Sequence, residues 1–321
     1  AERELPFWQA ITASPAPALG ARQADDPRSR QAEGLHSRRS LVTSLPAEVT
    51  GALLTGVPAA FHGRVNDVLL AGLAAAVAWW RGASFAGTTP YGSASFAGTT
   101  PYGNGWAGGS AVLVDVEGHG REEDVVPGAD LSRTVGWFTS MYPVRLDAGA
   151  VDWDQLCAGG PDAGLAVKRV KEQLRAIPGH GIGFGLLRYL NPRTRPVLAG
   201  AAPAQLGFNY LGRFGSAGAL GAGWEPVPDA AALGGGSALA HPVEVDAVAM
   251  ESAAGPVLHA TWSWDSSLLS EDQVASLAGA WLAALRGIAA HVGGGGGGWT
   301  PSDVPLVRVS QEELDELEAD L

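Results

Sequence analysis

The sequence predicts a layered α/β sandwich in which helices pack against a mixed sheet. Apolar runs of strand length alternate along the chain with longer segments of helical spacing, and neither type is confined to one half. The chain has 321 residues, of which 46% are hydrophobic and 17% are charged. These proportions are typical of a globular protein with a sizeable core, built as one large domain or two small ones.

The N-terminal part is predicted to be helical on either side of a linker. A short helix is expected around Trp8, followed by a linker at residues 14–39 that is rich in Pro, Ala, Arg and Asp. A helix is expected at residues 47–54, where a proline and an acidic residue stand in the first turn. The next helix, at residues 66–80, is apolar on most faces, which predicts a position between layers.

The nonapeptide SFAGTTPYG occurs twice, at residues 84–92 and 95–103, and is followed by more glycines. Two copies are too few for a solenoid, which needs about three stacked repeats. We therefore expect a Gly/Thr/Pro-rich surface-loop insertion at residues 84–109.

The rest of the chain contains five segments that are predicted to be strands. They are residues 111–116, 141–146, 205–211, 243–250 and 257–264. In the last of these, Leu258, Ala260, Trp262 and Trp264 fall on one face at a period of two.

Three further helices are expected. One lies at residues 166–177, and a second runs from a capping box of Ser270 and Gln273 to about His291. Six glycines at residues 293–298 then predict a flexible link. The third is an acidic terminal helix that begins at a capping box of Ser310 and Glu313, with Leu314, Leu317 and Leu321 in a narrow stripe.

Composition excludes several classes of function. A formal net charge of -12 without a basic patch argues against nucleic acid as a partner. Cys157 is the single cysteine, so an internal disulfide is impossible, and we expect a cytoplasmic location. The longest apolar run, residues 68–80, is shorter than a bilayer requires, so we expect no membrane partner. The chain begins at Ala1 and is expected to be part of a longer protein.

The strongest local signal is the strand at residues 111–116 running into EGHGRE at residues 117–122. Two glycines there permit a tight turn with side chains presented at the strand mouth. If the turn stays roughly extended, Glu117, His119 and Arg121 share one side, and their charges tune each other's pKa. A solvated charged turn is the alternative.

Two more segments are candidates. In RTVGWFTSMYP, residues 133–143, the aromatic side chains predict either the entry to a core strand or the wall of a channel for a long thin substituent. In FNYLG, Asn209 and Tyr210 must point to opposite faces of a regular strand, so at most one faces a given cavity unless a bulge intervenes.

Other catalytic devices are missing from the sequence. It contains neither a G-x-S-x-G nucleophile elbow nor a Walker motif. GIGFG at residues 181–185 lacks dinucleotide-binding spacing and is interpreted as a turn. His241 stands alone and is expected to be structural at a strand start. No metal site is expected, since no His or Cys has zinc-ligand spacing.

The order of the motifs is more specific than any one of them. They are RVNDVLL (64–70), EGHGRE (117–122), DLSRTVGWFTSMYP (130–143), GIGFGLLRYL (181–190), FNYLGR (208–213) and TPSDVPLV (300–307). Over nearly the whole chain this series resembles the signature motifs of epimerization domains in nonribosomal peptide synthetases. EGHGRE together with RTVGWFT separates that branch from ordinary condensation domains. The tandem nonapeptide and His180 depart from the family pattern.

The resemblance implies the chloramphenicol acetyltransferase-like fold, two similar two-layer α/β lobes with a tunnel between them. Residues 41–292 match the C-terminal lobe, after an opening helix and linker at 1–40 and before a glycine linker, TPSD segment and acidic helix at 293–321. The implied activity inverts the α-carbon of an aminoacyl or peptidyl thioester. The phosphopantetheine arm of a peptidyl carrier protein delivers the substrate, without an intrinsic cofactor.

The resemblance also implies roles for individual residues. Glu117 is one catalytic group, and the His-His-x-x-x-Asp-Gly motif of the missing N-terminal lobe supplies the other. Tyr210 or Asn209 would steady the enolate or the substrate amide. The expected substrate or pantetheine channel consists of His119, Arg121, Arg133, Trp137, Phe138 and Tyr142.

Because half of the site is absent, the isolated chain is expected to be an inactive part of an amino-acid epimerase, an isomerase. A non-catalytic carrier-docking lobe and a lobe of a condensation-type acyltransferase are the alternatives. For Glu117 to act as a base, burial would have to raise its pKa toward about 6 to 7, whereas His119 or Arg121 would lower it. The sequence leaves open which influence prevails.

Overall fold

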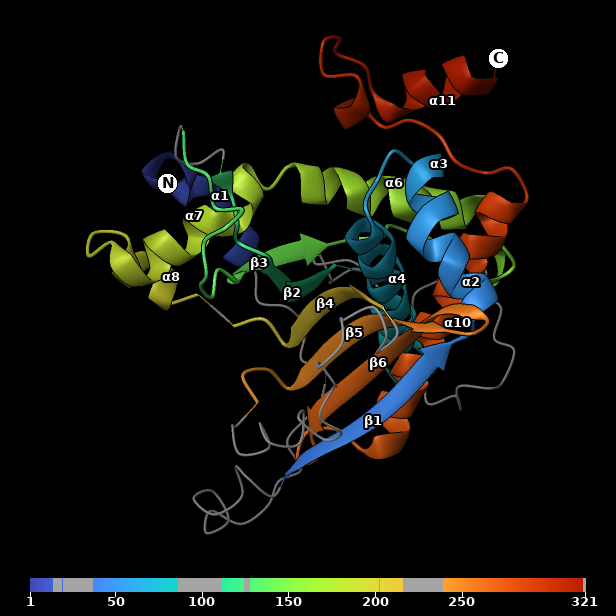
Figure 1. The fold of residues 1–321 in the computed structure, drawn as a ribbon, viewed down its shortest axis with the longest axis horizontal. Helices are drawn as coiled ribbons and strands as arrows, with labels where there is room; N and C mark the ends of the chain where they lie inside the picture. The colour runs from blue at the N-terminus through green and yellow to red at the C-terminus, as the bar shows by residue number, and fades with distance from the viewer. Residues whose placement is uncertain are drawn as a thin grey trace.

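The computed structural model describes residues 1–13, 19, 37–85, 111–123, 128–201, 203–215 and 239–319. Within these residues a six-stranded sheet is packed against long helices (Figure 1). Most of the predicted N-terminal linker and nearly all of the insertion predicted at residues 84–109 lie outside the described residues.

The sheet is mixed, as predicted. Its strand order is β1-β6-β5-β4-β2-β3, with parallel pairing of β2 with β4 and of β4 with β5, and antiparallel pairing elsewhere. The strands are β1 (Arg38–Leu45), β2 (Val112–Gly118), β3 (Ser140–Leu146), β4 (Leu206–Phe214), β5 (Val243–Ser252) and β6 (Gly255–Asp265).

All five strands predicted from the sequence are present, and one strand was missed. β1 begins at Arg38, inside the segment interpreted as a linker, and pairs with β6 along its whole length. It is an edge strand in which Leu45 is buried while Val42 is 62% exposed. Such a strand lacks the apolar alternation that identifies a half-buried strand in a sequence.

Three long helices cover one face of the sheet: α4 (Val65–Phe85), α6 (Pro161–Arg175) and α10 (Glu271–Gly293) (Figure 1). The shorter helical segments are η1 (Glu2–Glu4), α1 (Leu5–Thr12), α2 (Ala47–Gly51), η2 (Ala52–Gly56), α3 (Val57–Ala60), α5 (Trp153–Cys157), η4 (Pro178–Gly181), α7 (Ile182–Gly185), η5 (Leu186–Leu190), α8 (Arg195–Ala199), η7 (Pro301–Asp303) and α11 (Gln311–Ala319).

The core lies between these helices and the sheet. The Trp281 indole of α10 donates to the carbonyl of Leu69 in α4 at 3.0 Å and meets Trp262 of β6 edge to face. Gly72 lets α4 and α10 approach closely, since a Cβ there would lie 2.8 Å from Leu285. Of the described helices, α10 alone is long and apolar enough to cross a membrane, but its apolar face forms this core.

The opening helix docks on the rest of the fold. Trp8 of α1 is fully buried and packs against Phe184 of α7 and Tyr142 of β3. The guanidinium of Arg145 on β3 donates to the Ile11 carbonyl at 2.9 and 3.1 Å. α1 therefore extends the layered structure beyond the β3 edge of the sheet.

Several helix boundaries differ from the prediction. α4 continues through Gly82 to Phe85, and α6 begins at Pro161, five residues before the expected start, because proline fits the first helical turn. GIGFG is not a simple turn: after a left-handed Gly181, residues 182–185 form α7, which continues into the π-helix η5.

The C-terminal segment is more tightly attached than a flexible link. Within the glycine run, the Gly298 amide donates to the Ala60 carbonyl at 3.0 Å. The capping boxes at Ser270 and Ser310 are confirmed. Of the predicted leucine stripe in α11, Leu314 is buried, Leu317 is 58% exposed, and Leu321 is outside the described residues.

Candidate functional site

Glu117 lies at the carboxyl end of β2, on the sheet face opposite the long helices. β2 extends through Gly118, so Glu117 is still part of the strand, in register with Met141 of β3. Its side chain is half-buried. Burial and the carboxylates of Asp246 and Glu244 raise the pKa of Glu117, while His241 lowers it, and the net shift is upward.

Two residues from neighbouring strands share this face with Glu117. Val116 is in register with Phe208, so Glu117 is followed across the sheet by Asn209, which is in register with Asp246 of β5. We call these three residues the Glu117 row. Asn209 hydrogen-bonds Asp246, but burial and Glu244 still raise the pKa of Asp246 above its ordinary value.

A second polar row lies one step earlier along the same strands. Asp115, Gly207 and Glu244 are in register, and we call them the Gly207 row. The imidazole of His241, which precedes β5, crosses this row: its Nε2 is 2.9 Å from Asp115 Oδ2, and its Nδ1 is 3.5 Å from Glu244 Oε1. Burial disfavours the imidazolium, but Asp115 and Glu244 raise the pKa of His241 to about 9.

Tyr210 is on the other face of the sheet. It is in register with the buried Ala247 and packs against the core, and burial raises its pKa. The register shift in β4 comes after Tyr210, so the pleat up to this point is regular. Of the two predicted candidates in FNYLG, Asn209 therefore shares a face with Glu117 and Tyr210 does not.

The EGHGRE segment does not stay extended beyond Gly118. Gly120 has a φ of 67°, where a Cβ would lie 1.5 Å from the Phe138 carbonyl oxygen. The guanidinium of Arg121 is held by the carbonyls of Leu131 and Thr134 at 2.5 and 2.9 Å. The condition for His119 and Arg121 to share one side with Glu117, an extended turn, is therefore not met in this structure. Neither residue contributes to the shift in the pKa of Glu117.

His119 instead belongs to a turn fastened by Glu122. Its Nδ1 accepts from the Arg121 amide at 3.0 Å, and its Nε2 is 3.9 Å from Glu122 Oε1. Glu122 Oε2 is 2.6 Å from Nδ1 of His180, whose φ is 51°. Sequence reasoning found His180 only as an exception to the family pattern and missed its partner.

The remaining residues predicted for the channel differ in their surroundings, and their role there stays a prediction. Arg133 is exposed, and Trp137 is 91% exposed. Phe138 lies beneath the Arg121 guanidinium, with 4.4 Å between Cζ and the ring centroid. Tyr142 packs beside Trp8, and burial raises its pKa.

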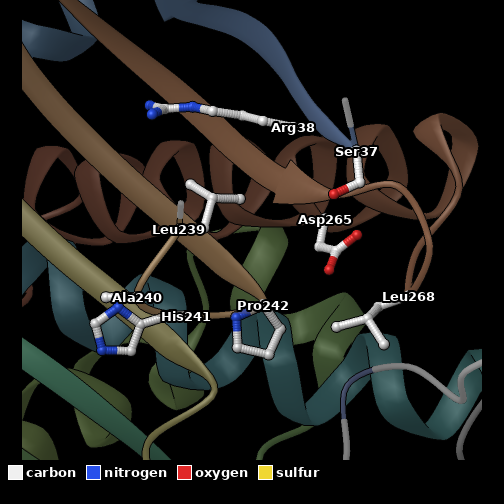
Figure 2. Close-up of a pocket in the computed structure, with 8 residues that line it drawn as sticks. All are labelled: Ser37, Arg38, Leu239, Ala240, His241, Pro242, Asp265 and Leu268. Atoms are coloured by element: carbon white, nitrogen blue, oxygen red, sulfur yellow. The ribbon is translucent and has the colours of Figure 1, made fainter. Parts of the chain in front are cut away.

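A pocket of about 250 Å³ opens at the other end of the sheet (Figure 2). Figure 2 shows Ser37, Asp265 and Leu268 on one side of Pro242 and His241 on the other. None of the catalytic or channel residues predicted from the sequence lines this pocket. No group of three or more His, Cys, Asp or Glu side chains with metal-binding geometry occurs in the described part of the chain.

Comparison with known proteins identifies sequence relatives. A family model described as "Condensation domain" matches residues 104–215. Two of the large polypeptides that make up linear gramicidin synthase, both from Brevibacillus parabrevis, are 34% and 35% identical to the chain, with 98% of this chain aligned in each case. The chain spans only 4% and 5% of the length of these two relatives.

Solved structures resemble the fold. The epimerization domain from the third module of tyrocidine synthetase B is 28% identical with a TM-score of 0.64, over 90% of this chain and 55% of that one. The X-domain from teicoplanin biosynthesis is 18% identical with a TM-score of 0.53, over 91% of this chain and 55% of that one, a likeness of fold alone.

Proposed function

We propose that this chain, which belongs to the condensation-domain superfamily of nonribosomal peptide synthetases, forms the C-terminal lobe of an epimerization domain. The reaction would invert the α-carbon of an aminoacyl or peptidyl thioester that a peptidyl carrier protein presents on its phosphopantetheine arm. Support comes from the similarity to a solved epimerization domain and from the EGHGRE and RTVGWFT motifs. A cytoplasmic location belongs to the same proposal.

The observation that carries this proposal is the environment of Glu117. Inverting an α-carbon requires a base on one face of the carbon and an acid on the other. A carboxylate with an ordinary pKa is a weak base near neutral pH, and catalysis improves as the pKa approaches the working pH. Half-burial beside Asp246 and Glu244 moves the pKa of Glu117 in that direction.

Asn209 is the better candidate for stabilising the enolate. Its amide lies with Glu117 on the sheet face opposite the long helices, whereas Tyr210 packs against the core on the face that these helices cover. A side-chain amide donor aimed at a developing oxyanion is a common stabilising group. The hydrogen bond between Asn209 and Asp246 would fix which end of the amide faces the substrate.

The second catalytic group would come from the missing N-terminal lobe. The solved epimerization domain is nearly twice as long as the part this chain covers, since 55% of it aligns. We assign the opposing face of the α-carbon to a residue of that lobe. Glu117 alone supplies one face.

Acyl transfer by a condensation-type lobe is the second candidate, because the matching family model is described as a condensation domain. The two reactions differ in their products. Epimerization changes the configuration of the bound acyl group and exchanges its α-proton with solvent, whereas condensation joins it to a second carrier-bound amine.

The test uses the complete domain with its carrier loaded with an L-aminoacyl group in deuterated water. We expect the released amino acid to contain the D-enantiomer with deuterium at the α-carbon. Supplying a second loaded carrier tests the alternative in the same mixture. Formation of a dipeptide without α-deuterium or D-product would overturn the proposal in favour of acyl transfer.

A further inference from the structure

We infer that His241 is a positioning residue for Glu117, a buried cation that crosses β4 and joins the strand carrying Glu117 to the strand carrying Asp246. The inference rests on the proposed acid–base role of Glu117. His241 touches no reacting atom in this role. It acts through its own charge and by holding β2, β4 and β5 in alignment.

Geometry gives the first support. The His241 ring lies over Gly207, the one residue of the Gly207 row without a side chain, and a Cβ there would be 2.7 Å from Nδ1. Its two nitrogens face Asp115 of β2 and Glu244 of β5, the neighbours of Gly207 on either side. The ring therefore fills a gap that the sequence leaves in the middle of the sheet.

The second support is that the ring is buried between two carboxylates. His241 is 5% exposed, and a buried imidazole between two acids is stable as a cation. Figure 2 shows His241 beside Ala240 and Pro242, among the residues that line the pocket. The pKa of about 9 agrees with a protonated ring at neutral pH.

The third support is the distance along the strands. Glu117 follows Asp115 by two residues and Asp246 follows Glu244 by two, which is about 7 Å on the same face. The His241 cation therefore lies about 7 Å from the Glu117 row, two residues earlier along the parallel strands. Other charged or titratable groups on this face include Asp115, Glu244 and Asp246. They also include Arg145 of β3, His259 and Asp265 of β6 and, from β1, Arg38, which donates to Ser263 at 3.3 Å.

This arrangement predicts opposite effects for two neighbouring residues. Removing the cation of His241 leaves the acids uncompensated, so the proton on Glu117 is held more tightly. Removing the negative charge of Glu244 has the reverse effect. A general loosening of the fold would move both variants in the same direction.

The first experiment is a carbon-13 NMR titration of the Glu117 carboxyl group in the full chain. We expect the midpoint to rise by about 0.5 pH or more in His241→Gln and to fall in Glu244→Gln. His259→Gln, a histidine of β6 outside the Gly207 row, is the matched control and should leave the midpoint unchanged. A midpoint that is the same in His241→Gln and in the parent chain would overturn the inference.

Gly207→Ala provides a second route if His241→Gln does not fold. The added methyl group displaces the ring and leaves its chemistry intact, so the Glu117 midpoint should again rise. If the midpoint stays in place while the His241 ring signals shift, the inference is wrong.

Activity separates the inference from the function on which it rests. In the complete domain, the acidic limb of the pH–rate profile for α-proton exchange should move upward in His241→Gln, as the midpoint does. If the midpoint moves but exchange is independent of Glu117, the proposed function fails and the electrostatic role of His241 stands. If exchange depends on Glu117, but His241→Gln moves neither the Glu117 midpoint nor the acidic limb of the pH–rate profile, His241 has no positioning role.

Discussion

At the residue scale, the chemistry of Glu117 depends on side chains that come from other strands. Asp246 and Glu244 are more than 120 positions away along the chain and reach Glu117 through the pairing of β2 with β4 and of β4 with β5. His119 and Arg121, which are adjacent in sequence, turn away at Gly120. Burial is the largest cause of the upward shift in the pKa of Glu117, and sheet register brings in the two carboxylates that add to it.

Sequence reasoning could identify Glu117, since glycines after a buried strand mark a strand mouth. It could also state that Asn209 and Tyr210 point to opposite faces, because strand alternation requires it. It could not decide which of the two joins Glu117, since that requires the order of the strands. It also missed Asp246, whose surrounding alternation is that of an ordinary half-buried strand.

His241 makes a prediction about stability at this scale. Its folded pKa of about 9 is above the unfolded value of about 6.5, so its contribution is fully present below about pH 6.5 and is lost as pH rises through about 9. The loss should be on the order of 3 kcal/mol. Urea unfolding of the full chain between pH 6 and pH 10 measures it, with His241→Gln as the reference. Parallel curves for the two proteins would show that the folded ring is neutral.

At the scale of elements, the C-terminal segment is fastened to α6 by two lysines in different surroundings. Lys171 is fully buried, and its ammonium donates to the Phe61 carbonyl at 2.6 Å and pairs with Asp303 at 2.5 Å. Burial raises the pKa of Asp303, but hydrogen bonds from Lys171 and Thr300 hold it below its ordinary value. Lys168 is also buried, but it pairs with Asp315 and Glu318 of α11, whose carboxylates are partly exposed and can be hydrated without it.

These surroundings predict unequal costs. Lys171→Met leaves the Asp303 carboxylate and the Phe61 carbonyl without their partner, so we expect a loss of about 3 to 5 kcal/mol. Lys168→Met, the matched control on the same helix, should cost about 1 kcal/mol. Denaturant unfolding of both variants checks the difference. Equal losses would mean that the Lys171 contact does not hold the segment in place.

The elements that the sequence predicted best have a strong local signal. Apolar alternation located β5 and β6, and the capping box of Ser270 fixed the start of α10. β1 was missed because it is an exposed edge strand. The run GIGFG was interpreted as a turn, because a segment rich in glycine has a low helix propensity. In the structure it is helical, and Phe184 packs against Trp8.

At the scale of the whole molecule, the chain supplies one half of the proposed catalytic site. It covers 55% of the solved epimerization domain that it resembles. The fold class followed from the mixed order of helices and strands, whereas the division of the site between two lobes came from the family resemblance. Composition carries no signal of such a division, because each lobe would have a core of its own.

It follows that the 321-residue chain alone should not epimerise a carrier-bound substrate. Under the proposed division of the site, one base on one face of the carbon permits proton exchange with retention, and the opposing acid belongs to the other lobe. Chiral analysis of the amino acid released from a loaded carrier checks this, with the complete domain as the positive control. D-product formed by the purified chain would show that this lobe holds both catalytic groups.

The central claim is that Glu117 is an acid–base group of an epimerase, and the most direct test is Glu117→Gln in the complete domain. The exchange of the α-proton is followed in deuterated water from carriers loaded with each enantiomer. Glu123→Gln, which alters an exposed carboxylate in the same turn, is the control.

We expect thermal stability and carrier binding to be retained, while exchange falls by about 10² or more for at least one enantiomer. Loss for one enantiomer places Glu117 on one face of the carbon, and equal loss for both fits a shared role in steadying the enolate. Exchange at the parent rate from both enantiomers would contradict the catalytic assignment and make Glu117 a charged residue of the strand end.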